Sequence, residues 1–284
     1  SQGQTTSLTS SGLGTMITPG SIDPAGRPNY IITGGTRPGD GPNLFHSFGD
    51  FSVGTNNVAR FLNETGRSTT NILSRVTGGQ TSNMYGAIET AGFGTAALWL
   101  INPAGIVFGP SASLNVGGSV HFSTADYLRL GSGNDRFYAD LGKTSQLTSA
   151  PVTAFGFLNP NPQPITVQGA TLDVQKHTPN EPARSLSLVG GDIQLSGGTL
   201  KAEAGINLVS MASQGEVGTD TVPGGINKPT LGTITMASSL LDTAAPELGS
   251  FRRSGPIVIR GSQLVMDQST ITASVSGVSL AQFN

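Results

Sequence analysis

A recurring unit of short, alternating apolar stretches separated by small residues constrains this chain more than any other feature. After about residue 164, such stretches open at Ile165, Leu186, Ile206, Ile234 and Ile257, at steps of roughly 20 to 28 residues. Apolar residues two positions apart are typical of a β-strand that buries one face. A unit of this length cannot bury that face by itself, but stacked units bury a continuous column of side chains. The repeat therefore predicts a parallel β-helix.

The composition agrees with an all-β chain. Charged residues make up only 11% of the sequence, and 40 of its 284 residues are Gly. A helical bundle needs many more Glu, Lys and Ala and far fewer glycines. A disordered tail is excluded because 36% of the residues are hydrophobic and the net charge is -2.

Charge and cysteine content exclude several partners and sites. With 15 Lys and Arg against 17 Asp and Glu, the chain lacks the basic surface that binds nucleic acid. The absence of cysteine excludes disulfides, cysteine-ligated zinc and a thiol nucleophile, and it suits a chain that crosses an oxidising periplasm unfolded. The longest wholly apolar run, residues 96–101, is far shorter than the roughly 20 residues of a membrane-spanning helix. We therefore expect no membrane insertion.

Outside the repeats the sequence gives coarser expectations. Residues 1–40 are rich in turns, with one expected strand at 30–33. Residues 58–76 have helical spacing and are expected to be a helix or an irregular stretch, since Gly66 and the two threonines at 69–70 argue against one continuous helix. The N-terminus has neither the basic start nor the apolar stretch of a signal peptide, so we presume that such a peptide has been removed. No capping element is recognisable before Asn284, and we expect the natural chain to continue.

Three insertions rich in small and turn-forming residues interrupt the repeats, at 175–184, 214–230 and 243–254. They fall at similar places relative to their strands, and insertions at one phase of a solenoid emerge on one side of it. Their simplest interpretation is that they are variable loops.

Several longer segments carry a family resemblance. Arg-Val-Thr-Gly-Gly at 75–79, Leu-Trp-Leu-Ile-Asn-Pro-Ala-Gly-Ile-Val-Phe-Gly at 98–109 and Leu-Asn-Val-Gly-Gly-Ser at 114–119 follow one another in that order. Segments 43–48 and 257–261 agree with the same pattern. Together they resemble the N-terminal secretion domain of filamentous-haemagglutinin-like exoproteins, the exported partner in two-partner secretion, and in particular its cyanobacterial-type members.

The resemblance is dense over about residues 30–130 and looser up to about residue 275. It implies a right-handed parallel β-helix with N-terminal capping strands and extra-helical hairpins or loops. We expect a single domain in three parts: a cap with the first strands at 1–50, the secretion core with the first coils at 51–160, and further coils with loop insertions at 161–284.

The resemblance singles out one turn as the secretion and folding motif. The family tetrad is Asn-Pro-Asn-Gly followed by Ile; Asn102, Pro103, Gly105 and Ile106 match it, and Ala104 stands at the third position. Asn-Pro-x-Gly is a favourable β-turn, because Asn bonds its own backbone, Pro presets φ and Gly relieves strain. The turn could act by starting the β-helix or by contacting the transporter directly. A second family motif, Asn-Pro-Asn-Leu, is absent from its upstream place, and residues 159–162 are not its equivalent.

The remaining motif positions are taken as supporting residues of the secretion domain. They are Asn43, Leu44, Phe45, His46, Arg75, Gly78, Gly79, Gly117 and Gly118. The resemblance implies a secreted or cell-surface protein that reaches the outside through the periplasm. We expect it to be a monomer and to need no cofactor. Its partner is an outer-membrane β-barrel transporter with periplasmic POTRA-type domains, which recognises the extended segment before the chain folds outside the cell.

Two other function classes stay open. A β-helix enzyme that degrades polysaccharides needs paired carboxylates facing one groove. The candidates here are single and irregularly placed, and most are interpreted as turn or corner residues: Asp173, Asp192, Glu203 and Asp242. An adhesin segment could bind a surface glycan or receptor through downstream regions. Trp99 is the single Trp, and its apolar surroundings favour the core over a sugar platform.

Metal and nucleotide sites are weakly supported. His46, His121 and His177 are too dispersed to suggest metal ligands. The Gly-Ser-Gly-Asn-Asp stretch at 131–135 is solitary, so it is interpreted as a hairpin turn rather than a calcium repeat. The Gly-x-Gly-x-x-Ala pattern at 92–97 lacks the strand–turn–helix unit of a nucleotide site.

Overall fold

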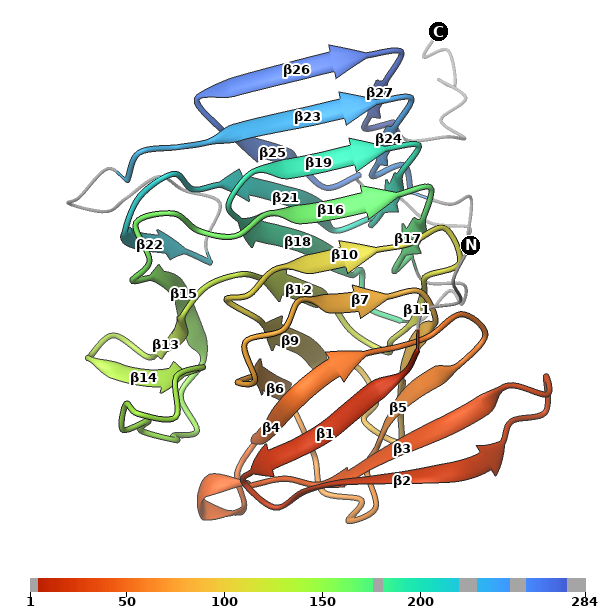
Figure 1. Ribbon diagram of the computed structural model, residues 1–284, viewed down its shortest axis with the longest axis vertical. Coiled ribbons are helices and arrows are strands. Elements are labelled where there is room, and N and C mark those ends of the chain that lie inside the picture. Colours follow the sequence, from red (N-terminus) through yellow and green to blue (C-terminus); the bar gives the residue numbers. More distant parts are fainter. Residues whose placement is uncertain (1–4, 176–180, 220–228, 246–253, 275–284) are drawn as a thin grey trace, which may run out of the picture.

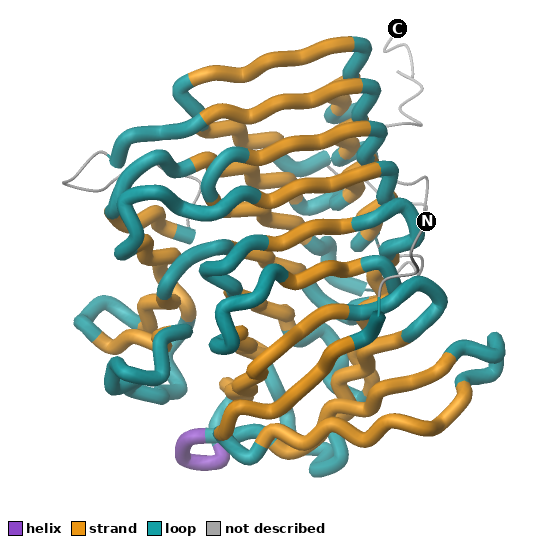
Figure 2. Tube along the Cα trace, in the orientation of Figure 1, coloured by secondary structure: helices purple, strands orange, loops and turns teal. Residues whose placement is uncertain are grey.

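The computed structural model describes residues 5–175, 181–219, 229–245 and 254–274. It is a three-sided parallel β-helix whose coils stack along the long axis of the molecule (Figure 1). Strands and connecting loops make up nearly all of it, and the described part of the chain contains one helical turn, η1 (Pro38–Asp40) (Figure 2).

Sheet A forms the first side of the helix and holds eight strands. Its first strand is antiparallel to the second, and the others run parallel. In spatial order they are β1 (Ser7–Gly12), β4 (Asn43–Ser52), β6 (Asn71–Val76), β9 (Ala97–Ile101), β12 (Val120–Ser123), β18 (Ser185–Gly190), β21 (Gly205–Ser210) and β25 (Ile257–Arg260).

Sheet C forms the second side and is parallel throughout. It comprises β7 (Ser82–Met84), β10 (Ile106–Phe108), β16 (Ile165–Gln168), β19 (Ile193–Ser196), β23 (Thr233–Ala237) and β26 (Gln263–Asp267).

Two sheets share the third side. Sheet B comprises β2 (Thr15–Ile22), β3 (Pro28–Gly34), β5 (Val58–Leu62), β8 (Ala87–Ala91) and β11 (Ser113–Asn115). Sheet E follows it, since β11 contacts its first strand, and comprises β17 (Thr171–Asp173), β20 (Thr199–Lys201), β24 (Leu240–Asp242) and β27 (Thr270–Thr272). The predicted fold class, a parallel β-helix with capping strands, is confirmed.

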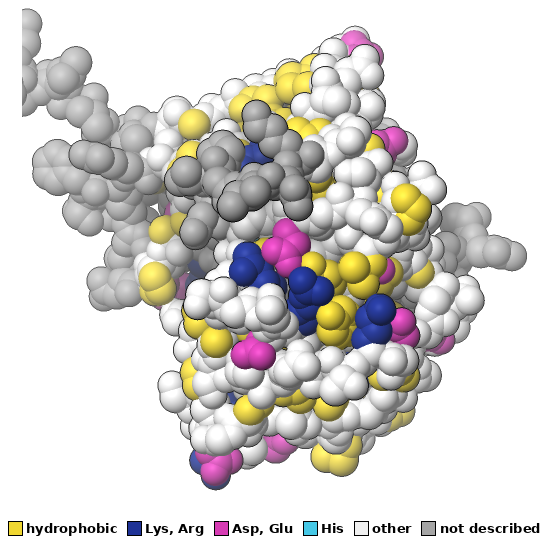
Figure 3. Space-filling model, turned by 90° about the vertical axis from the view of Figure 1, so that its left-hand side faces the viewer, with side chains coloured by type: hydrophobic (Ala, Val, Ile, Leu, Met, Phe, Trp, Pro, Cys, Tyr) yellow, Lys and Arg dark blue, Asp and Glu magenta, His cyan; other side chains and the backbone are white. Residues whose placement is uncertain are grey.

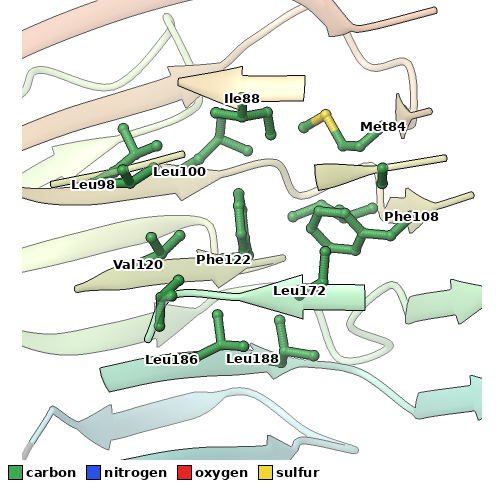
Figure 4. Close-up of a cluster of buried hydrophobic side chains, with 14 of the residues drawn as sticks. Met84, Ile88, Leu98, Leu100, Phe108, Val120, Phe122, Leu172, Leu186 and Leu188 are labelled. Carbon is green, nitrogen blue, oxygen red and sulfur yellow. The ribbon is translucent and has the colours of Figure 1, made fainter. Parts of the chain in front are cut away.

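The helix interior is a continuous apolar column, as the repeat predicted. Leu98 and Leu100 of β9 point into it beside Val120 and Phe122 of β12, while Phe108 enters from sheet C (Figure 4). All five side chains are fully buried. Burial of this kind contributes about 1.5 to 3 kcal/mol per large apolar side chain, so stacked coils support one another.

The phase of the repeats differs from the sequence interpretation. Leu186, Ile206 and Ile257 align with one another in sheet A. Ile165 and Ile234, however, lie in sheet C, where each pairs with Ile193. The five predicted repeat starts therefore belong to two different sides of the helix. The sequence did not separate them, because the strands of both sides begin with the same apolar alternation.

Two local expectations were wrong. Residues 58–76 hold two strands, β5 and β6, rather than a helix or an irregular stretch. Ala59 and Phe61 face the interior while β5 pairs with β3 and β8. The turn-rich start of the chain holds β1, β2 and β3 instead of one strand. Pro19 is tolerated because β2 is an edge strand with a register shift at this point.

A fourth layer, sheet D, packs outside the helix. It is an antiparallel sheet in the order β14 (Asp135–Tyr138), β13 (Tyr127–Leu130), β15 (Val152–Phe157) and β22 (Gly215–Gly218). Its first three strands leave the helix between β12 and β16, and β22 leaves between β21 and β23. Both excursions start where sheet A passes to sheet C, so they meet on the same side of the molecule.

The insertions therefore do not share one corner. The middles of all three lie outside the described residues, but their flanking strands place them. Insertions 175–184 and 243–254 both connect sheet E to sheet A, whereas 214–230 connects sheet A to sheet C and contributes β22. The expectation of a single side was wrong for the second insertion.

Candidate functional site

The Asn102–Ile106 motif forms the corner between β9 and β10. The Gly105 N–H donates to the Asn102 carbonyl at 3.1 Å, which closes a β-turn, and the Ala104 N–H donates to Asn102 Oδ1 at 2.9 Å. Gly105 adopts a φ of 113°, a conformation that other residues rarely take. The hydrogen bonds within the turn use the backbone of Ala104, so Ala at this position is compatible with the closed turn.

The Asn102 side chain also joins the turn to the preceding coil. Its Nδ2 donates to the Gln80 carbonyl at 2.9 Å and to Ser82 Oγ at 2.8 Å. Its backbone N–H donates to the Ser123 carbonyl of the following coil at 2.9 Å. Asn102 is fully buried, and a buried amide gains about 0.5 to 1.5 kcal/mol from each such bond. One asparagine thus connects three consecutive coils.

Ile106 begins β10 directly after the turn. It is fully buried in the interior and lies in register with Ser82 on one side and Ile165 on the other. Pro103 lies on the partly exposed corner. The motif therefore combines a partly exposed corner at Pro103 with a buried apolar side chain, Ile106, in the helix interior.

Three of the supporting glycines occupy positions where coils stack too closely for a side chain. A Cβ on Gly117 would lie 1.9 Å from the carbonyl oxygen of Gly94, and one on Gly118 would lie 2.3 Å from that of Ala96. At Gly78 the corresponding distance to the carbonyl oxygen of the preceding coil is 2.4 Å. These residues are needed for the spacing of the coils.

Asn43 and Phe45 face outward from β4, toward sheet D. Asn43 Nδ2 donates to the carbonyls of Thr148 at 2.9 Å and Ala150 at 2.7 Å. Phe45 packs edge-on against Phe137 of β14, with ring centroids 4.9 Å apart. Both side chains hold the extra-helical segment against sheet A.

Leu44 and His46 point the other way, into the helix under the N-terminal strands. Leu44 belongs to the interior cluster. His46 Nδ1 lies 3.0 Å from Thr15 Oγ1 of β2, and its ring contacts Phe61. Burial lowers the pKa of His46 from 6.5 to about 3, so the imidazole is neutral at physiological pH. It is a packing residue of the capped end.

Arg75 reaches outward from β6 and is nearly buried. Its Nε donates to Ser47 Oγ at 2.8 Å, and a terminal nitrogen donates to the Tyr138 carbonyl at 2.7 Å. The guanidinium also lies over the Phe137 ring. Burial lowers the pKa of Arg75. Its partners here are neutral, which indicates that Arg75 fastens β14 to the helix.

The site residues thus form two groups. Asn102, Gly105, Ile106 and the glycines shape the corners and the interior, while Asn43, Phe45 and Arg75 bind sheet D. Sequence reasoning missed Asn71, which bridges Asn43 and Trp99. The two stretches that begin at Asn43 and Asn71 align in register in sheet A, and this repeat could have revealed Asn71.

The sequence matches the family of the TPS secretion domain over residues 10–264. The chain belongs to this family. TPS domains are parts of secreted exoproteins, and their partner is a two-partner secretion transporter.

Two solved secretion domains match this chain, and the first of them resembles it in fold. The HMW1 secretion domain from Haemophilus influenzae is 18% identical, with 95% of this chain and 67% of that chain covered and a TM-score of 0.55. The filamentous hemagglutinin secretion domain is 15% identical, with 94% of this chain and 98% of that chain covered and a TM-score of 0.46. No curated protein matches the sequence.

The acidic residues weighed for catalysis occupy corners of this TPS domain. Asp173 Oδ1 accepts the Gln175 N–H and Asp242 Oδ1 accepts the Ala244 N–H, each at 2.8 Å. Asp192 Oδ1 accepts the Thr233 N–H at 2.9 Å. For these three aspartates the corner interpretation is confirmed. The TPS family is a secretion family rather than an enzyme family.

The other candidate ligands also have structural roles. Trp99 is buried, stacks on His121 at a centroid distance of 3.8 Å and belongs to the cluster beneath sheet D, so its predicted core position is confirmed. His177 lies outside the described residues. Residues 131–135 form the predicted hairpin turn between β13 and β14. Within the described ranges, no three His, Asp or Glu side chains gather as a metal site, and no helix could span a bilayer.

Proposed function

We propose that this TPS domain is recognised by an outer-membrane β-barrel transporter with periplasmic POTRA-type domains and then nucleates β-helix folding outside the cell. The proposal rests on the hydrogen bonds of Asn102. Its buried side chain binds the coil before its own turn, and its backbone N–H binds the coil after it. A corner that connects three coils through contacts close in sequence can form early, before the rest of the helix exists.

The closed N-terminal end supports folding in one direction. β1 pairs with β4, and β2 pairs with β3, at the base of the stack. Each later coil adds mainly to the previous one, so growth can proceed without distant contacts. In this proposal residues 1–50 cap the helix, 51–160 hold the secretion core, and 161–284 extend it. The chain travels through the periplasm after removal of a signal peptide.

Secretion of interior and exterior variants of one strand tests the proposal. Ile106→Asp places a charge in the apolar interior, whereas Val107→Asp changes the neighbouring, outward-facing and half-buried residue. We expect Ile106→Asp to reduce the amount of secreted exoprotein at least tenfold and Val107→Asp to leave most of it. Unchanged secretion of the Ile106→Asp exoprotein would contradict folding as the driving step.

Binding to the transporter separates recognition from folding. If the transporter recognises the extended segment, the Ile106→Asp chain should still bind the purified periplasmic domains with the affinity of the parent chain. If the Ile106→Asp chain loses both its binding to these domains and its secretion, the result would instead indicate that the Asn102 turn contacts the transporter directly.

A further inference from the structure

Sheet D packs against the helix along much of its length. An apolar cluster lies between sheet D and the outer face of sheet A, separate from the cluster that fills the helix interior. All four strands of sheet D contribute side chains to it. On the other side, five of the six consecutive strands from β4 to β21 contribute, with Phe45, Leu73, Trp99, Val189 and Val209. The layer therefore contacts coils that are several strands apart in the stack.

Polar contacts fasten sheet D at both ends of this stretch. At the N-terminal end, Asn43 and Arg75 donate to carbonyls of the extra-helical segment that contains β14 and β15. At the other end, β22 pairs with β15 and carries Glu216. The Tyr127 hydroxyl donates to Glu216 Oε1 at 2.6 Å, and Arg129 Nε lies 3.1 Å from Oε2. Lys and Arg side chains gather beside an acidic one on this side of the molecule (Figure 3). β22 thus closes the layer at the coil of β21.

Gly156 lets Tyr127 reach β22. Tyr127 lies on β13, and β15 separates β13 from β22 in the sheet. A Cβ on Gly156 would lie 1.9 Å from Cζ of Tyr127, so the phenol can cross β15 because Gly156 has no side chain. Arg136 lies over the same ring at 4.4 Å. The bond between Tyr127 and Glu216 therefore depends on a residue of a third strand, and it can be broken there without a change of charge.

The coil that follows β22 lacks this cover in the described part of the chain. β25 is the next strand of sheet A after β21, and Val258 on its outer face is half-buried and outside the cluster under sheet D. β26 and β27, the last strands that the structure describes, are mostly exposed. These strands are held by their neighbours in the stack, as in a simple solenoid.

The covering layer changes how the coils depend on one another. In a solenoid, stability is approximately a sum over neighbouring coils, so end coils open first and the others follow in turn. A layer that packs on five strands adds contacts that are not between neighbours. Opening one covered coil breaks part of the layer that also covers the others, and this couples their opening.

We propose that sheet D is a clasp, closed by β22, that joins the coils from β4 to β21 into one cooperative block. The block is complete only when residues 215–218 have docked, whereas the coils that follow open separately. During export, closure of the clasp prevents the folded coils from unravelling back into the transporter. This consequence for export rests on the proposed function, while the clasp itself does not.

Hydrogen exchange of the full chain, followed by mass spectrometry, tests the clasp. In the parent chain we expect peptides from β4, β6, β9, β18 and β21 to share one free energy of opening with peptides from sheet D. They should exchange at least tenfold more slowly than peptides from β26 and β27. Opening free energies that change regularly from β4 to β21 would overturn the proposal.

Two variants break the clasp in different ways. Glu216→Lys places a third cation beside Arg129 and Arg136, and Gly156→Ala forces the neighbouring phenol away from β22. Each should speed exchange in sheet D at least tenfold and should separate the opening of β4 from that of β21. Asp267→Lys on the exposed β26 is the control and should leave the block unchanged. Variants in which β22 alone exchanges faster would also overturn the clasp. If neither variant folds, as judged by circular dichroism, the parent pattern decides.

Secretion of the same variants tests the consequence for export. We expect Glu216→Lys and Gly156→Ala to lower the amount of secreted exoprotein at least threefold and Asp267→Lys to leave it unchanged. If Ile106→Asp stops secretion but both clasp variants are secreted like the parent chain, the export role of the clasp is wrong and the proposed function stands. The exchange experiment contains no transporter, so its result does not depend on the proposed function.

Discussion

Asn71 donates its side-chain amide to Asn43 Oδ1 at 3.0 Å across two neighbouring coils. Asn43 in turn donates to two carbonyls of the extra-helical segment, and Trp99 Nε1 donates to Asn71 Oδ1 at 2.9 Å. A chain of hydrogen bonds therefore runs along the outer face of sheet A and ends on the layer that covers it. These bonds join the helix to the extra-helical segment that precedes β15.

The first prediction concerns this chain of hydrogen bonds. Asn43→Ala leaves the Thr148 and Ala150 carbonyls without their donor and should lower the free energy of unfolding by about 1 to 3 kcal/mol. Asn43→Asp should cost more, because a carboxylate would face the same carbonyls. Urea unfolding measures both, and Asp at the exposed Asn161 is the control. Equal stability of the two Asp variants would refute this role.

The second prediction concerns coil spacing. Gly117→Ala forces a methyl group against the Gly94 carbonyl, whereas Gly133 in the β13–β14 hairpin has open space around it. We expect Gly117→Ala to cost about 1 to 3 kcal/mol and Gly133→Ala to stay within about 0.5 kcal/mol. Thermal unfolding of both variants provides the comparison, and similar melting temperatures would argue against close stacking at Gly117.

The third prediction concerns His46 and mild acid. Its pKa is 6.5 when unfolded but about 3 in the buried site, so the unfolded chain takes up a proton first. The contribution of the neutral ring to the free energy of unfolding is therefore complete above pH 6.5. It is lost as the pH falls toward 3, at about 1.4 kcal/mol per pH unit. His46→Asn should remove this slope from urea unfolding. His121, with a pKa also lowered to about 3 by burial, should retain its own.

The fourth prediction concerns the ion-pair network on sheet B. Asp23 accepts the Arg27 N–H at 2.8 Å and pairs with its guanidinium, while Arg27 and Arg60 both contact Glu89. The backbone bond from Arg27 lowers the pKa of Asp23 below 3.8. Its stabilisation is therefore present above pH 3.8 and lost as the pH falls through the folded value.

Asp23→Asn should accordingly make the unfolding midpoint less sensitive to acid as the pH falls below 3.8. The exposed Asp40, which pairs with Arg67 at 3.7 Å, is the matched position for an Asp→Asn control. A larger effect at Asp40 than at Asp23 would show that the network on sheet B does not govern the acid response.

Local chemistry was predictable from the sequence where neighbours along the chain make the contact. The Asn102–Gly105 turn closes through atoms three residues apart, and its Asn, Pro and Gly specify it. The period-two alternation likewise predicted stacked strands, because an inward face of Ile, Leu and Val must be covered. The partners of Arg75 could not be predicted, since Tyr138 and Ser145 lie far along the chain.

By itself, the sequence determined that this chain forms short strands, turns at Asn102 and buries one side of each coil. Tertiary structure decided the phase of each coil, and it turned the helical spacing of 58–76 into two strands through pairing with their neighbours. It also decided that two excursions leave at the same corner and meet in sheet D, where Glu216 finds Tyr127. The alternation of apolar residues can be recognised from neighbouring residues in the sequence. Contacts between distant segments cannot, because they depend on how many coils lie between those segments.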